Sequence, residues 1–212
     1  QVDQRVLIVL RRRDADAPKF SLLLEFSQDR QRRGILVPRA RPRVKLHEID
    51  AVGFQIAQAQ LLRVMQHISM RNYVGLGVRG SLPCEGRRGY HWHQSPGSIL
   101  AAESRVQEAI AAARSKFNVH ADRIFLAGHE AGGTMAYRLA LRSPRNYAGA
   151  LSAGGRFPLG QRPLMNLHSL RDLPLFLAYC RDSETYSSDD ICDELPLFHA
   201  AALKVAIRQY PC

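Results

Sequence analysis

A glutamate in a glycine-rich run is the residue best placed for chemistry in this chain of 212 residues. Glu130 follows the apolar residues 124–127, which are typical of a strand covered on both faces. Small residues around it permit a sharp turn from that strand into a helix. The run consists of Gly128, His129, Glu130, Ala131, Gly132 and Gly133. At the tip of such a turn, a carboxylate can serve as a nucleophile or bind a nearby arginine.

The same run has a simpler interpretation as an ordinary strand-to-helix turn. Glycine-rich turns of this kind hold phosphate groups at helix N-termini. The negative charge of Glu130 opposes that use, so the turn does not predict a phosphate site. His129 adjoins Glu130, but neighbours along a tight turn point in different directions and need not form a dyad.

The elements that must position this turn alternate along the chain. Apolar, β-branched segments predict strands at residues 6–10, 20–26, 73–78, 123–127, 148–153, 173–179 and 205–210. Apolar residues at helical spacing, and the small residues after 130, predict helices at 49–70, 99–117 with Ser98 as N-cap, 131–141, and 190–204 with an interruption or start at Pro196. This order predicts a single α/β domain over 1–212, with a mostly parallel central sheet and helices on both faces.

Several segments resemble the α/β-hydrolase superfamily, and in particular its phospholipase/carboxylesterase-like branch. The match around the turn comprises residues 122–128 and 132–136, which resemble the nucleophile elbow. The other matching segments are Arg79-Gly80-Ser81 and Gly89-Tyr90-His91-Trp92 upstream, and residues 148–155 and 173–179 downstream. The resemblance covers most of residues 73–210 and implies an α/β-hydrolase-like fold.

Each catalytic position that the resemblance implies departs from the family. Glu130 stands where the nucleophilic serine belongs. Ser183 takes the place of the acid, flanked by the acid-turn candidates Asp182 and Glu184. The histidine is expected just after strand 205–210, where the chain ends at Cys212, and residues 24–27 lack the His-Gly pair of the oxyanion loop. The resemblance therefore implies a fold in which Ser-His-Asp catalysis has been lost.

The sequence is compatible with three different functions. The favoured hypothesis is a non-catalytic member that binds a small molecule or a protein partner in the former cleft, with no cofactor. The first alternative is an active carboxylic-ester hydrolase whose nucleophile is Glu130 or lies elsewhere. The second is a nucleic-acid or anionic-surface binder, because the net charge is +11 and residues 1–45 hold twelve basic against five acidic residues. Its candidate contacts are the arginines at 11–13, 30–33 and 39–43.

Cysteines and apolar runs bear on the cellular setting. The four cysteines match no C-x-x-C pattern, which predicts reduced thiols in a cytoplasmic protein. Cys84 with His91 and His93 lacks the pattern of a further zinc ligand, so we expect no metal site. No apolar run approaches the roughly 18 to 20 residues that span a bilayer. The oligomeric state has no signal in the sequence.

Overall fold

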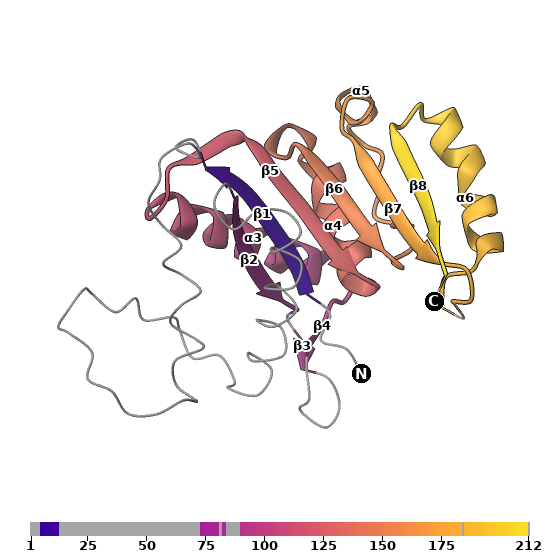
Figure 1. Ribbon diagram of the computed structural model, residues 1–212, viewed down its shortest axis with the longest axis horizontal. Coiled ribbons are helices and arrows are strands. Elements are labelled where there is room, and N and C mark those ends of the chain that lie inside the picture. Colours follow the sequence, from indigo (N-terminus) through magenta and orange to yellow (C-terminus); the bar gives the residue numbers. More distant parts are fainter. Residues whose placement is uncertain (1–4, 13–72, 81, 84–89, 184, 212) are drawn as a thin grey trace.

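A twisted sheet of six strands forms the centre of the structure, a computed structural model (Figure 1). The structure describes residues 5–12, 73–80, 82–83, 90–183 and 185–211. The strand order is β2-β1-β5-β6-β7-β8. The strands are β1 (Arg5–Arg12), β2 (Tyr73–Arg79), β5 (Val119–His129), β6 (Gly149–Ala153), β7 (Leu175–Cys180) and β8 (Val205–Tyr210), with β3 (Leu82–Pro83) and β4 (Tyr90–His91) in a separate two-stranded ladder. The helices are α3 (Pro96–Arg114), α4 (Ala131–Arg142), α5 (Leu167–Leu170) and α6 (Ser188–Ala200), with a 3-10 turn η1 (Pro144–Asn146).

Strands β5 to β8 run parallel, and this confirms the predicted α/β class. Strand β1 differs, because it lies between β2 and β5 and is antiparallel to both. In this register Ile8 is opposite Leu126 on one side and Leu76 on the other. The predicted hairpin partner of β1, residues 20–26, lies outside the described residues. So does the predicted helix 49–70.

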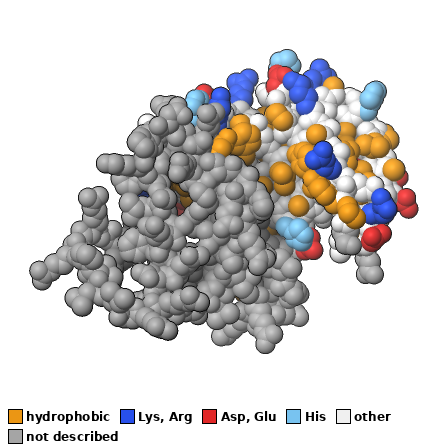
Figure 2. Space-filling model, viewed as in Figure 1, with side chains coloured by type: hydrophobic (Ala, Val, Ile, Leu, Met, Phe, Trp, Pro, Cys, Tyr) orange, Lys and Arg blue, Asp and Glu red, His pale blue; other side chains and the backbone are white. Residues whose placement is uncertain are grey.

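One face of the sheet packs against helices α3, α4 and α6. Ile8, Leu126 and Ala150 on this face belong to one buried apolar cluster with residues of all three helices. The opposite face exposes Phe125 and Leu151, each 36 % accessible, although the apolar run 124–127 predicted cover on both sides. Figure 2, in the same view as Figure 1, shows hydrophobic side chains gathered over the strands. The described helices thus cover the face of the sheet on which α4 lies, directly after the elbow.

Helix α3 begins earlier than the apolar pattern predicts. Its N-cap is Ser95, whose hydroxyl accepts a hydrogen bond from the Ser98 amide at 3.3 Å. Pro96 occupies the first helical position, where its missing N–H costs nothing. The prediction of Ser98 as the cap was therefore wrong by three residues. Just before the helix, Trp92 is 4 % exposed and belongs to the buried apolar cluster.

Helix α6 begins with a capping box that the sequence prediction missed. The Ser187 hydroxyl accepts a hydrogen bond from the Asp190 amide, and the Asp190 carboxylate accepts one from the Ser187 amide at 2.9 Å. The helix then continues through Pro196 instead of starting or breaking there, and ends at Ala200. None of the helices in the described ranges is both long and apolar enough to cross a membrane.

Candidate active site

The turn between β5 and α4 has the strained backbone that the elbow prediction requires. Glu130 adopts φ 48° and ψ −123°, a conformation that residues with a Cβ rarely take. Two hydrogen bonds hold it there. The Glu130 amide donates to the Ala153 carbonyl at 2.8 Å, and the Glu130 carbonyl accepts from the Thr134 amide at 3.0 Å. Glu130 is therefore fixed between the end of β6 and the first turn of α4.

Close approach of backbone segments explains the small residues around Glu130. A Cβ on Gly128 would lie 2.2 Å from the Gly132 carbonyl, and one on Gly133 would lie 2.3 Å from the Ser152 hydroxyl oxygen. Gly155 was not singled out from the sequence, yet a Cβ there would lie 2.1 Å from the Glu130 carbonyl oxygen. All three contacts are below the separation that real Cβ atoms show, so any larger residue would shift the turn.

Glu130 lines a cavity of about 210 Å³ at the carboxyl ends of the parallel strands. This end of an α/β sheet is where ligands generally bind. Each of β5 to β8 contributes to the wall through its last residues. The lining residues are His129, Glu130, Ala153, Gly154, Ala178, Tyr179, Cys180, Ser183, Thr185 and Tyr210. The cavity thus combines one carboxylate with two phenols and two hydroxyls.

The acid turn brings a hydroxyl to this cavity. Ser183 lines the wall, while Asp182 is exposed and is not among the lining residues. The Ser183 hydroxyl lies 3.1 Å from that of Thr185 and accepts a hydrogen bond from the Tyr186 amide at 3.2 Å. Glu184, the other acid-turn candidate, lies outside the described residues. Glu130 is therefore the carboxylate that the described wall presents to the cavity.

A polar cluster behind the cavity fastens the acid turn to helix α6. The fully buried Tyr186 donates its hydroxyl hydrogen to the Glu194 carboxylate, whose other oxygen accepts from the Phe157 amide at 3.2 Å. Burial raises the pKa of Glu194 above its usual range, against the lowering effect of these hydrogen bonds. Arg156 adds an ion pair to Asp190 at 2.9 Å and donates to the Thr185 carbonyl at 3.3 Å. The position of Ser183 and Thr185 at the cavity depends on this cluster.

The described wall of the cavity offers few candidates for a catalytic base. His129 is the single histidine on that wall, and it is the chain neighbour of Glu130. His199 is exposed on α6, and His168 lines a different cavity beside α5. Within the described ranges, no group of three or more His, Cys, Asp or Glu side chains could hold a metal ion.

The cysteines correct one sequence prediction. Cys180, the last residue of β7, is disulfide-bonded, and Cys192 is a free, exposed thiol. Cys84 and Cys212 lie outside the described residues. The prediction of reduced thiols was therefore wrong for Cys180. Because disulfides are rare in cytosolic proteins, the basis for predicting a cytoplasmic protein is lost as well. The arginines at 13, 30–33 and 39–43 also lie outside the described residues.

Comparison with known proteins agrees with this geometry. The structure is similar to a carboxylesterase from Mesorhizobium loti, with a TM-score of 0.59 and 18 % identity over 74 % of this chain and 75 % of that one. It is also similar to the Bacillus cereus carboxylesterase, with a TM-score of 0.54 and 16 % identity over 72 % and 73 % of the two chains. Identities this low show the shared fold alone. No sequence among the curated proteins matched.

The family comparison covers the elbow and the strands on either side of it. The family model for phospholipases and carboxylesterases matches residues 90–204, which is more than half of the chain. The matched range contains β5, the turn at Glu130, α4, the acid turn and most of the cavity wall. On this match, the chain is a member of the phospholipase/carboxylesterase family of α/β-hydrolases.

Proposed function

We propose that this chain is a non-catalytic member of its family, which binds a ligand in the cavity at Glu130. One observation carries the proposal: the elbow keeps its strained backbone and its glycine contacts, while the residue at its tip is a glutamate. Ester hydrolysis in this fold develops negative charge on the substrate oxygen next to the elbow. A carboxylate at the tip would repel that charge. The same turn that favours hydrolysis when it carries a serine therefore disfavours hydrolysis when it carries Glu130.

Glu130 is also a poor nucleophile toward an ester carbonyl. Attack would form a mixed anhydride, and the tetrahedral intermediate would expel the carboxylate more readily than the alkoxide of the substrate. The next step would need a base to activate water. The described wall of the cavity offers His129 alone for that task. Both steps therefore disfavour turnover of carboxylic esters.

The cavity itself supports a binding role. Its volume of about 210 Å³ lies below the roughly 300–1,000 Å³ of pockets that hold drug-sized ligands. It suits a small molecule, or one side chain presented by a protein partner. The phenols of Tyr179 and Tyr210 and the hydroxyls of Ser183 and Thr185 supply hydrogen-bonding groups on its wall. Few polar groups on a mostly apolar wall are typical of a site that orients a ligand.

Restoring the serine tests this proposal. Glu130→Ser supplies the family's nucleophile on an unchanged turn, and Glu130→Ala is the matched control. The proposal expects neither variant to react with a fluorophosphonate probe or to hydrolyse 4-nitrophenyl butyrate above the rate of the wild-type chain. Rapid labelling of Glu130→Ser alone would show that a base and an oxyanion site are present and that Glu130 alone blocks catalysis, whereas ester hydrolysis by the wild-type chain that Glu130→Ala loses would overturn the proposal.

An active enzyme with Glu130 as its nucleophile is the second candidate, because Glu130 and His129 line the same cavity. A carboxylate is a competent nucleophile toward an epoxide or an alkyl halide, because its oxygen can attack the carbon without prior deprotonation, forming an ester as the ring opens to an alkoxide or the halide leaves. Intact-mass measurement after incubation with styrene oxide distinguishes the two functions. The binding proposal expects no adduct on Glu130, whereas an adduct lost in Glu130→Gln would favour the enzyme.

A further inference from the structure

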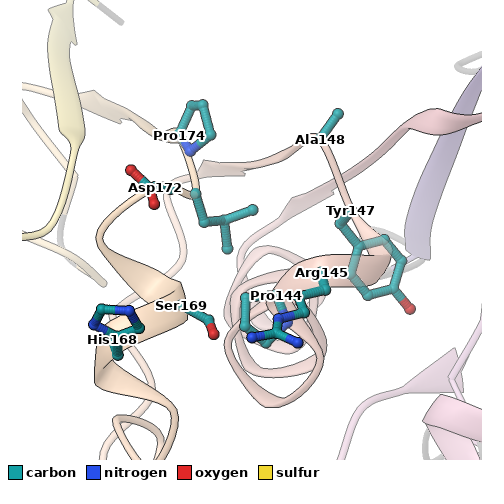
Figure 3. Close-up of a pocket in the computed structure, with 9 residues that line it drawn as sticks. Pro144, Arg145, Tyr147, Ala148, His168, Ser169, Asp172 and Pro174 are labelled. Carbon is teal, nitrogen blue, oxygen red and sulfur yellow. The ribbon is translucent and has the colours of Figure 1, made fainter.

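A second cavity, of about 340 Å³, lies between η1 and α5 (Figure 3). Its wall includes Ala148 and Pro174, each of which directly precedes a strand, β6 or β7. The Glu130 cavity is lined by Ala153 and Cys180, the last residues of the same two strands. Because a strand rises about 3.3 Å per residue, the two cavities are roughly 15 to 20 Å apart. The second cavity is therefore a separate site at the opposite end of the sheet.

One side of this cavity is apolar and rigid. Pro144, Tyr147 and Leu173 line it and are buried. The Tyr147 hydroxyl accepts a hydrogen bond from the Gln107 side chain at 3.1 Å, which fixes the ring. Burial, with a contribution from the nearby carboxylate of Glu103, raises the pKa of Tyr147 to about 12. Its phenol is therefore neutral at physiological pH, and this wall carries no charge.

The other side carries a positive charge that has no described partner. Figure 3 shows the side chains of Arg145 and Ser169 facing one another across the cavity. Asp172 also lines the cavity, and its carboxylate forms an ion pair with the Lys204 ammonium at 3.0 Å. Arg145 makes no hydrogen bond or ion pair with any residue in the described ranges. The polar side thus presents the Arg145 guanidinium, the Ser169 hydroxyl, the His168 ring and the Lys204-paired carboxylate of Asp172 opposite an apolar wall.

We propose that this second cavity binds a small organic anion. A carboxylate or a phosphate ester would lie between Arg145 and Ser169, and the apolar part of the ligand would contact Leu173 and Tyr147. The planar guanidinium presents paired N–H donors that match the oxygens of both anion types. The Ser169 hydroxyl donates a further hydrogen bond to the same group. Both contacts would favour an anion over a neutral ligand of the same shape.

Serine, histidine and aspartate all line this cavity, but they do not form a catalytic triad. His168 and Ser169 are neighbours on the four-residue helix α5, and Asp172 is paired with Lys204. Within the described part of the chain, no hydrogen bond joins any two of the three side chains. A triad requires the base to bond both the nucleophile and the acid. The three residues therefore lack the geometry of a catalytic site, and the proposal is limited to binding.

Titration of the ¹⁵N-labelled wild-type chain with three probes tests the proposal. Phenylacetate and phenyl phosphate carry the two anion types, and phenylacetamide is the neutral match of phenylacetate. We expect at least one anion to shift the amide resonances of residues around Arg145 and Ser169. The amide should bind about tenfold more weakly, as loss of a charge-assisted hydrogen bond implies. The anion with the lower Kd identifies the head group.

Two variants test whether the anion binds at Arg145. Arg145→Gln should weaken binding of the anion about tenfold. Arg171→Gln removes an exposed arginine close by that does not line the cavity, and should leave the Kd unchanged. Both residues are exposed, so neither change disturbs the core. The proposal is overturned if neither anion binds, if phenylacetamide binds as tightly as phenylacetate, or if the two variants weaken binding equally.

Discussion

Gly133 lies directly against Ser152 beneath the elbow. A Cβ on Gly133 would be 2.3 Å from the Ser152 hydroxyl oxygen and 3.0 Å from the Gly128 carbonyl oxygen. Ser152 is fully buried and already donates to the Gly155 carbonyl at 2.8 Å, so it cannot turn away without losing that bond. We expect Gly133→Ala to lower the free energy of unfolding by about 1–3 kcal/mol, measured by urea denaturation.

Gly97→Ala is the matched control for this change. Gly97 also lies in the first turn of a helix, but a Cβ there meets no atom within 4 Å. Alanine is the better helix former, so this variant should be as stable as the wild-type chain or up to about 1 kcal/mol more stable. Equal losses in the two variants would show that the contact with Ser152 does not limit the size of residue 133.

Backbone strain at Glu130 predicts an unusual order of stability. At φ 48° and ψ −123°, a Cβ is in steric conflict with the backbone, which costs free energy. Glycine has no Cβ and therefore avoids that strain. Glu130→Gly and Glu130→Ala both remove the carboxylate and differ in the Cβ. We expect the glycine variant to be about 1 kcal/mol more stable than the alanine variant in urea denaturation. If alanine is equally stable, the turn is not strained.

Glu194 makes stability depend on pH in a defined direction. Its pKa is raised in the folded state, mainly by burial, so the folded chain favours the protonated carboxyl. The stability that this provides is complete below the unfolded pKa and is lost as pH rises through the folded pKa. We therefore expect the wild-type chain to lose stability relative to Glu194→Gln as pH rises from the ordinary glutamate pKa, about 4, through the raised pKa of the folded state. Urea denaturation across that range measures the difference, and a constant or opposite trend would contradict it.

The disulfide at Cys180 predicts which thiols react. Without reductant, iodoacetamide should modify Cys192 and leave Cys180 unmodified, as peptide mapping by mass spectrometry can show. Cys180→Ser should lower the free energy of unfolding by about 2–4 kcal/mol. Cys192→Ser, at an exposed position, should change it by less than about 0.5 kcal/mol. Alkylation of Cys180 in the unreduced chain would contradict the disulfide.

Local sequence signals were enough to predict most of the elements near the site. The helix after Glu130 begins at Ala131 as predicted, because an apolar strand ends at a run of small residues there. Strand β8 also has its predicted bounds, Val205–Tyr210. The place of β1 was not predictable in this way. A strand pattern states that a segment is extended, but its neighbours β2 and β5 are chosen by contacts distant in the chain.

The site residues also fall into two groups, those that the local sequence predicts and those that depend on tertiary contacts. The sequence identified Glu130 and the demand for small neighbours, since both follow from the local turn. The resemblance placed Ser183 at the acid's position, and Ser183 does line the cavity, but the bond between Tyr186 and Glu194 behind that turn had no signal in the sequence. Nor could it pair Cys180, since four cysteines allow three complete pairings and the spacing selects none. Tertiary contacts determine these features.

Ester turnover at Glu130 tests the central claim most directly. The wild-type chain and Glu130→Ala should be compared with 4-nitrophenyl acetate and 4-nitrophenyl butyrate, at equal concentrations and from pH 6 to 9. The account predicts that both proteins hydrolyse the esters at the same rate, equal to that of the chain after unfolding in urea. Saturable hydrolysis by the wild-type chain that Glu130→Ala loses would contradict it.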